Sequence, residues 1–162
     1  MGKGGLFAGV LLASLWQSAH GQCAPAPDSA YFFRNLSESR AEAKLAANRV
    51  YYNQLLSDSF IAKDRDGKPA SRHEYIEHEL ASGRDLGPSP FFSIRDYTLL
   101  EHRKGYTVAS YRLVEGTTRG EVTHATETWL REIYEVVDGK WRLTGIEIAA
   151  GAPAAPDTTA AR

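Results

Sequence analysis

The chain has 162 residues, of which 43% are hydrophobic and 24% are charged, as is ordinary for a soluble globular protein. It has 19 lysines and arginines against 20 aspartates and glutamates, so its formal net charge is −1 and no basic surface for binding nucleic acid is expected. Without two non-globular ends, the length still suffices for one domain with a buried core.

The first 21 residues have the features of a secretory signal peptide. Lys3 and the amino terminus are positive, residues 6–16 form an apolar run, and the small residues Ala19 and Gly21 precede a cleavage site. The apolar run is too short for a comfortable transmembrane helix. We therefore expect cleavage after Gly21, export to the periplasm or secretion, and no stable membrane insertion afterwards.

Cys23 is the only cysteine, so no disulfide bond can form within the chain. A cysteine just after an export signal also suggests a lipoprotein. Gln22 stands where lipoprotein signals prefer a small residue, however, so an unpaired thiol is the favoured interpretation.

Residues 22–34 are predicted to be a flexible lead-in. Residues 149–162 are rich in Ala, Pro and Thr, and are predicted to be a disordered tail.

Residues 35–57 are predicted to form one long helix. Ser39 and Glu42 have the spacing of a capping box, and apolar residues recur at helical intervals. Asn48 lies on the same apolar stripe. We favour an interpretation in which its amide bonds to solvent or to a neighbouring strand, and the alternative is contact with a ligand.

A turn and a second helix are predicted to follow. Residues 60–62 are typical of a brief strand, and the Asp and Gly residues at 64–67 are typical of a tight turn. Ser71 and Glu74 form a second capping box, which predicts a short helix that ends near Ala81.

From residue 91 onward the sequence alternates as β-strands do. Asp138-Gly139 predicts a two-residue hairpin turn, because both central positions of a type I′ turn need a positive φ. Helices followed by a meander of strands predict an α+β fold, with the helices on one face of the sheet and the other face exposed or paired with a second subunit. The predicted strands are residues 92–103, 106–115, 123–137 and 140–148.

These motifs, in this order, resemble the nuclear transport factor 2-like (NTF2-like) superfamily, especially its SnoaL-like and DUF4440 branch. The resemblance covers residues 37–148 and places one domain at residues 35–148. It implies a cone in which a strongly curved antiparallel sheet wraps around N-terminal helices and a pocket, frequently as a homodimer through the outer face of the sheet. The superfamily contains isomerases, dehydratases, cyclases and adaptors, so no single activity is implied. The motifs are Leu55-Leu56-Ser57-Asp58-Ser59-Phe60, the turn through Asp64 and Gly67, Ser71-Arg72, residues 126–131 and residues 138–143.

The steroid isomerases of this superfamily imply three catalytic positions. These enzymes use a carboxylate base, a tyrosine and a protonated carboxylic acid on a late strand. By the family spacing the base falls on Asp64, the tyrosine position on Arg40 and the acid position near Arg131. Only Asp64 keeps the expected chemistry, and we favour its alternative interpretation as part of a solvated turn. A steroid-isomerase activity is therefore not expected.

One face of the strand predicted at residues 123–137 is a candidate wall for a ligand. Glu127, Trp129 and Arg131 share a face, and their carboxylate, ring and guanidinium would suit a small anionic or polar aromatic molecule. The competing interpretation, which we favour slightly, is a cross-strand ion pair on a partly exposed face. The candidate ligand-binding residues are Asn48, Tyr52, Tyr75, Tyr111, Glu127, Trp129 and Arg131.

The leading hypothesis is an exported domain that binds a small polar or anionic aromatic molecule in the pocket without catalysis. One alternative is a proton-transfer enzyme of the isomerase or dehydratase kind, with Asp64 or His78 as the base. Another is an interaction module that forms a homodimer through the outer sheet face. No cofactor is expected. No metal site is expected either, because His73 and His78 are five residues apart on the second helix and point in different directions.

Overall fold

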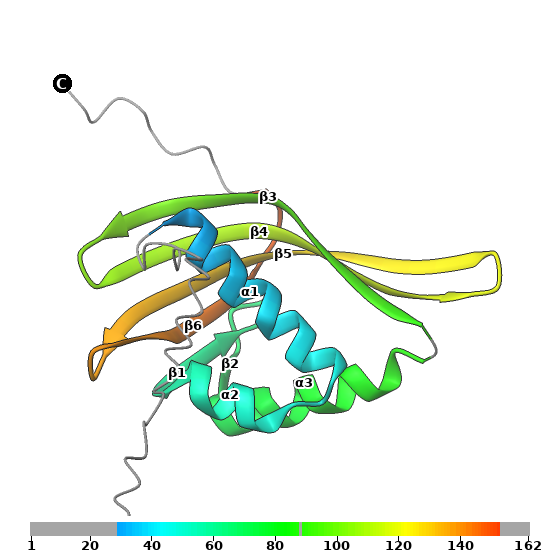
Figure 1. Ribbon diagram of the computed structural model, residues 1–162, viewed down its shortest axis with the longest axis horizontal. Helices are drawn as coiled ribbons and strands as arrows, with labels where there is room; N and C mark the ends of the chain where they lie inside the picture. Colours follow the sequence, from blue (N-terminus) through cyan, green and yellow to red (C-terminus); the bar gives the residue numbers. More distant parts are fainter. Residues whose placement is uncertain (1–28, 88, 153–162) are drawn as a thin grey trace, which may run out of the picture.

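The computed structural model describes residues 29–87 and 89–152 (Figure 1). The predicted signal peptide and Cys23 lie outside the described residues, as do most of the predicted lead-in and of the predicted tail. None of the helices in the described ranges is long and apolar enough to cross a membrane.

The first helix, α1 (Ala30–Leu45), begins earlier than expected. Ser29 caps it by accepting a hydrogen bond from the Phe32 N–H at 3.2 Å. Phe33 is fully buried in the core, which fixes this first turn against the sheet. Residues 30–34 therefore belong to the helix and not to the predicted lead-in.

The predicted single helix at residues 35–57 is in fact two helices. Between α1 and α2 (Arg49–Leu55), Ala47 adopts a left-handed conformation with φ +48°, which ends the first helix. The exposed Asn48 caps the second helix by accepting from the Tyr51 N–H at 3.1 Å. Asn48 is thus held by local backbone geometry.

The third helix, α3 (Arg72–Asp85), begins at the predicted capping box. The Ser71 side chain accepts from the Glu74 N–H, and the Glu74 carboxylate accepts from the Ser71 N–H at 2.8 Å. The helix extends four residues beyond the predicted end at Ala81. At Gly83 a Cβ would lie 2.1 Å from the Lys44 carbonyl oxygen, so a glycine is what lets α3 cross α1 this closely.

The described strands form one open sheet in the order β2-β1-β6-β5-β4-β3. Neighbouring strands are antiparallel except for β1 and β6, which are parallel, so the sheet is mixed rather than wholly antiparallel. The hairpin turn predicted at Asp138-Gly139 is confirmed, with positive φ at both residues. The strands are β1 (Leu56–Lys63), β2 (Pro69–Ser71), β3 (Pro90–Arg103), β4 (Tyr106–Arg119), β5 (Val122–Val137) and β6 (Lys140–Ala149).

The sheet curves around the helices, which all lie on its inner face (Figure 1). Register shifts along β3 and between Ile133 and Tyr134 of β5 mark irregularities that add bend and twist to the strands. This arrangement is the predicted α+β cone. The β4–β5 hairpin extends beyond the helical layer as a long arm (Figure 1).

Candidate functional site

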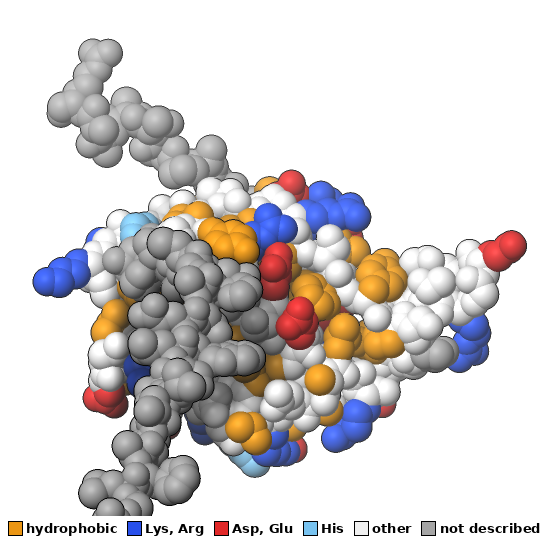
Figure 2. All heavy atoms as spheres, viewed as in Figure 1, with side chains coloured by type: hydrophobic (Ala, Val, Ile, Leu, Met, Phe, Trp, Pro, Cys, Tyr) orange, Lys and Arg blue, Asp and Glu red, His pale blue; other side chains and the backbone are white. Residues whose placement is uncertain are grey.

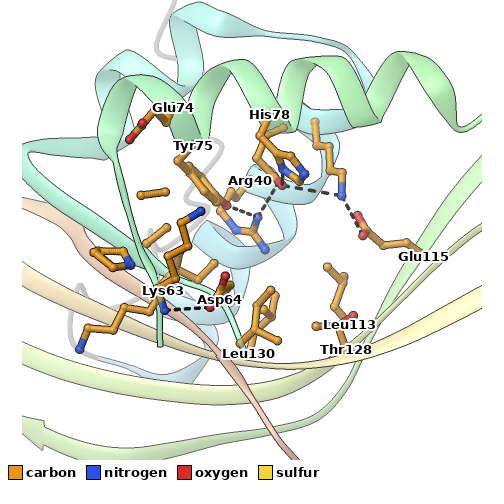
Figure 3. Close-up of a pocket in the computed structure, with 18 residues that line it drawn as sticks. Arg40, Lys63, Asp64, Glu74, Tyr75, His78, Leu113, Glu115, Thr128 and Leu130 are labelled. Carbon is orange, nitrogen blue, oxygen red and sulfur yellow. Dashed lines mark hydrogen bonds and ion pairs between the residues drawn. The ribbon is translucent and has the colours of Figure 1, made fainter. Parts of the chain in front are cut away.

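A cavity of about 550 Å³ lies between the helices and the inner face of the sheet. Figure 3 shows Tyr75 and His78 entering it from α3, and Leu113 and Leu130 from the sheet. The side chains that form its apolar wall are Ala62, Leu113, Leu130, Ile146 and Ile148. A pocket of this size with an apolar wall and a few polar groups is suited to a small organic molecule.

Charged side chains also line the cavity, with both signs present. Lys63 and Asp64 lie at one end, and Glu115 lies toward the other (Figure 3). The Arg, Lys, Asp, Glu and His residues in the lining are Arg40, Lys44, Lys63, Asp64, Lys68, Glu74, His78, Glu79 and Glu115.

Arg40 of α1 is the centre of a buried polar network at the inner end of the cavity. Its side chain is 1% exposed. It donates from Nε to Glu132 at 2.8 Å, from Nη1 to the Tyr75 hydroxyl at 2.9 Å, and from Nη2 to the Tyr111 hydroxyl at 3.0 Å. It also forms an ion pair with Glu79 at 3.2 Å. Burial alone would lower the pKa of Arg40, but the facing hydroxyls and carboxylates raise it, so the guanidinium stays charged.

Glu132 of β5 is the buried acceptor in this network. It is fully buried and accepts hydrogen bonds from Tyr111 at 2.8 Å and from Tyr134 at 2.7 Å, besides those from Arg40 and Ser37. Burial raises the pKa of both tyrosines well above its usual value, so their hydroxyls stay neutral and donate. A buried carboxylate with several donors is well compensated.

A second set of ionic contacts links α1, α3 and β4 beside the cavity. The Lys44 ammonium lies 2.8 Å from Glu115 and 3.9 Å from Glu79. His78 Nδ1 lies 3.7 Å from Glu79. Burial would raise the pKa of Glu79, but His78, Arg40 and Lys44 together hold it below its usual value. The contact with Glu79 in turn raises the pKa of His78.

Solved structures resemble this arrangement of helices and sheet. An NTF2-like protein of unknown function from Pseudomonas putida superposes with a TM-score of 0.64 and 14% identity over 80% of this chain and 91% of that one. The association domain of a CaMKII from C. elegans gives a TM-score of 0.61 and 10% identity over 72% and 92%. The chain has the NTF2-like fold.

Another structural neighbour is a protein from Shewanella frigidimarina described as a candidate ketosteroid isomerase. It superposes with a TM-score of 0.59 and 15% identity, over 75% of this chain and 96% of that one. No protein-family model matches the sequence, and no curated protein sequence matches it. Likeness at these identities shows the fold alone, and the SnoaL-like and DUF4440 branch stays a prediction.

The two candidate bases both line the cavity of this NTF2-like domain. Asp64 is exposed in the β1–β2 turn, where its Oδ1 accepts from the backbone N–H groups of Asp66 at 3.0 Å and of Lys68 at 2.9 Å. This geometry is that of the solvated turn favoured from the sequence. The His78 side chain is 77% exposed on α3, at the rim.

The three candidate tyrosines are buried, but only one of them lines the cavity. Tyr75 contacts the cavity directly. Tyr111 lies behind it in the Arg40 network, and the Tyr52 hydroxyl donates to the Arg40 carbonyl oxygen at 3.4 Å. Tyr52 and Tyr111 therefore support the inner end of the cavity. They do not form its surface.

The predicted wall of Glu127, Trp129 and Arg131 does not line the cavity. Strand alternation places Leu130 and Glu132 on the helix-facing side of β5, so the three candidates point to the outer face. There Glu127 pairs with Arg112 at 3.0 Å, and Arg131 lies 3.5 Å from Glu147. The cross-strand ion pairs of the competing interpretation are thus present. Asn48, the remaining candidate, caps α2 outside the cavity.

Sequence reasoning missed the charged residues that shape the cavity. Arg40, Lys44 and Glu79 were not among the candidates, although Arg40 and Lys44 are four residues apart and so share one face of α1. That i,i+4 spacing, next to the predicted apolar stripe of the helix, was the available signal. Within the described residues, no three His, Cys, Asp or Glu side chains gather in an arrangement that could hold a metal ion.

Proposed function

We propose that this NTF2-like domain binds a small organic molecule with an apolar body and an anionic group. The apolar wall from the sheet supports the first part of the proposal, because Leu113, Leu130 and Ile146 present apolar surface to the cavity. The charge balance of the lining supports the second part.

Each carboxylate of the lining has a partner within the chain, although the Glu115 Oε1 atom is buried without a hydrogen-bond partner among the described residues. Their partners are the backbone N–H groups of the turn for Asp64, Ser71 for Glu74, Arg40 for Glu79, and Lys44 for Glu115. Two of these carboxylates, Glu79 and Glu115, are paired with a cation of the chain, which reduces the negative charge that the lining offers to a ligand.

Lys68 is the cation of the lining that we expect to bind the anionic group of the ligand. Lys63 pairs with Glu147 at 2.9 Å, whereas the Lys68 ammonium forms no ion pair with any residue in the described ranges. Only a longer-range attraction links Lys68 to Glu74, whose carboxylate is already held by Ser71. An anionic group could therefore bind Lys68 without breaking a contact of the free protein.

Two fluorescent probes test this proposal. 8-Anilinonaphthalene-1-sulfonate has an aromatic body with an anionic group, and N-phenyl-1-naphthylamine is its uncharged counterpart. We expect the Lys68→Gln variant to bind the sulfonate about 1.4- to 5-fold more weakly and the amine equally well, because an exposed ionic contact contributes about 0.2–1 kcal/mol. Thr128→Trp, which places a larger side chain at the cavity wall, should weaken the binding of both probes.

Lys104→Gln, in the β3–β4 turn away from the cavity, is the matched control and should change neither affinity. Near-ultraviolet circular dichroism must show that each variant is folded, because the sulfonate also binds loosely packed states. Equal binding of both probes by the wild type and by Thr128→Trp would place their site elsewhere and defeat the proposal.

A proton-transfer activity is the second candidate, and one observation favours it. His78 lies at the rim with its ring beside the Glu79 carboxylate, an arrangement that can orient a general base. Asp64 is the weaker candidate because two backbone N–H groups hold its carboxylate in the turn. If the pocket binds the anionic probe, the NMR signals of the His78 ring should shift on binding. Unchanged signals would count against His78 as a catalytic residue.

We also propose that the domain acts after export and self-associates through its outer sheet face. The features of residues 1–21 support export, and sequencing the N-terminus of the protein from its host tests it, because a retained Met1 would refute cleavage.

Two observations support self-association. Trp129 and Ile133 lie on the outer face, and one of the structural neighbours is an association domain. Sedimentation of Ile133→Asp should then show a smaller species than the wild type.

A further inference from the structure

The arm formed by β4 and β5 has one edge with no strand beside it. β5 pairs with β4 without a register shift from Tyr106↔Glu135 to Arg119↔Val122. On its other side it pairs with β6, and that pairing ends at Trp129↔Ala149. Residues 122–128 therefore present backbone N–H and C=O groups of a regular strand that no other described strand meets.

The remaining edges of the sheet are protected against pairing. β2 at one end has three residues and begins with Pro69. β3 at the other end begins with Pro90 and carries two register shifts, with Asp96 at φ +54°. Short strands, prolines and bulges are the usual devices that keep a sheet edge from pairing with another chain.

Residues 122–128 carry none of these devices. Their sequence, Val-Thr-His-Ala-Thr-Glu-Thr, contains no Pro, Gly or Lys, and four of its seven residues are the β-branched Val and Thr that favour strands. Residues 122–127 are exposed. The arm projects past the helices, so the body of the domain leaves this edge open (Figure 1), and most of its visible face is neither hydrophobic nor charged (Figure 2).

The chain's own C-terminal segment is a poor occupant of this edge. Ala149 is the last residue of β6, and residues 150–152 leave the ladder as an exposed bend. Pro153 and Pro156 follow, and neither has an N–H group to donate to a strand. A strand from another chain therefore suits this edge better than the C-terminal segment.

We propose that residues 122–128 pair with the same residues of a second copy, antiparallel about a two-fold axis at Ala125. This register places Val122 opposite Thr128, Thr123 opposite Glu127, and His124 opposite Thr126, so no like charges meet. A parallel arrangement would place Glu127 against Glu127. Pairing over these residues stops where β6 begins to cover β5, so the length of the open edge fits the pairing.

This pairing has a consequence for the cavity. Thr128 lines the cavity and lies opposite Val122 of the second copy in the proposed register. The tip of each arm would thus lie at the wall of the other copy's cavity, and the two sheets would become one continuous sheet.

Disulfide cross-linking of single-cysteine variants in a Cys23→Ser background tests the register. Ala125→Cys should form a covalent dimer on oxidation, because directly opposed residues of an antiparallel pair have Cα atoms about 4.5–5.5 Å apart, within disulfide range. Thr123→Cys and Glu127→Cys should not, because each lies about four residues, roughly 13 Å, from its own counterpart. Failure of Ala125→Cys to cross-link, or equal cross-linking at all three positions, overturns the proposal.

Sedimentation supplies a second, independent test. In a shortened variant, Asn-Gly replaces residues 116–125 and joins the Glu115↔Thr126 pair by a hairpin turn. This variant should sediment as a smaller oligomer than the wild type at the same concentration. Ile133→Asp on the outer sheet face is the control and should leave the Ala125→Cys cross-link intact. A wild-type chain that is monomeric at about 100 μM, or an arm-shortened variant that associates as the wild type does, overturns the proposal.

Discussion

Replacing Arg40 by methionine should cost more stability than any surface substitution in α1. Methionine keeps most of the length of the side chain but leaves Glu132 fully buried without its cation. Removing one partner of a buried ion pair costs about 3–5 kcal/mol. For a domain of about 120 residues, each kcal/mol corresponds to about 4 °C in the melting temperature, so we expect a decrease of about 12–20 °C. Thermal and urea unfolding followed by circular dichroism measure it.

Two further variants test the reasoning behind that value. Arg34→Met breaks an exposed i,i+4 pair with Glu38 in the same helix and should cost less than about 1 kcal/mol. Adding Glu132→Gln to Arg40→Met should recover about 2 kcal/mol, because the unpaired buried charge is then gone. A loss below about 1 kcal/mol in Arg40→Met, or no recovery in the double variant, would show that this network does not hold the cavity together.

Three more predictions concern the helices. Gly83→Ala should lower stability by about 1–3 kcal/mol, because the new Cβ would lie 2.1 Å from the Lys44 carbonyl oxygen, whereas Gly151→Ala should change nothing in the same urea titration. Ser71→Ala should cost about 0.5–2 kcal/mol through loss of the N-cap, also measured by urea unfolding. In Glu79→Gln the pKa of His78 should fall back toward 6.5, as measured by NMR titration of the ring; an unchanged pKa would refute the contact.

The pKa of Glu79 also fixes a pH dependence of stability. This pKa is lower in the folded state than its usual 4.5, so the carboxylate stabilises the fold fully above about pH 4.5 and loses that contribution as the pH falls through the folded value. The difference in unfolding free energy between the wild type and Glu79→Gln should therefore shrink as the pH is lowered below about 4.5. A difference that stays constant from pH 6 to about pH 3 would contradict the assignment.

The parts of the fold that could be predicted from sequence are those set by local chemistry. The capping box of Ser71 and Glu74 and the hairpin turn at Asp138-Gly139 each depend on residues within three positions of one another. The helix break at Ala47 has no such signal, because alanine rarely adopts a positive φ. The helix break at Ala47 is therefore set by the surrounding fold and not by the local sequence, and Asn48 then caps the next helix.

The inner face of β5 could not be read from alternation alone. Both faces carry an aromatic residue and a charged residue, so Trp129 with Arg131 and Glu132 with Tyr134 are equally plausible inward sets. The inner set is decided by Arg40, which lies 92 residues before Glu132 and supplies the buried carboxylate with a cation. Such a long-range pair has no signature in the local sequence.

The same network separates the residues that hold the cavity from those that can recognise a ligand. Arg40 already donates to Glu132, Tyr75 and Tyr111 and pairs with Glu79, so an anion could reach its guanidinium only by breaking one of these contacts. Lys68 has no such contact to lose. Variants of Arg40 should therefore change the melting temperature, whereas Lys68→Gln should change the affinity for an anionic probe and leave the melting temperature within about 2 °C of the wild type. If Lys68→Gln melts much earlier, its ammonium has a structural role and the ligand's anionic group must be sought elsewhere.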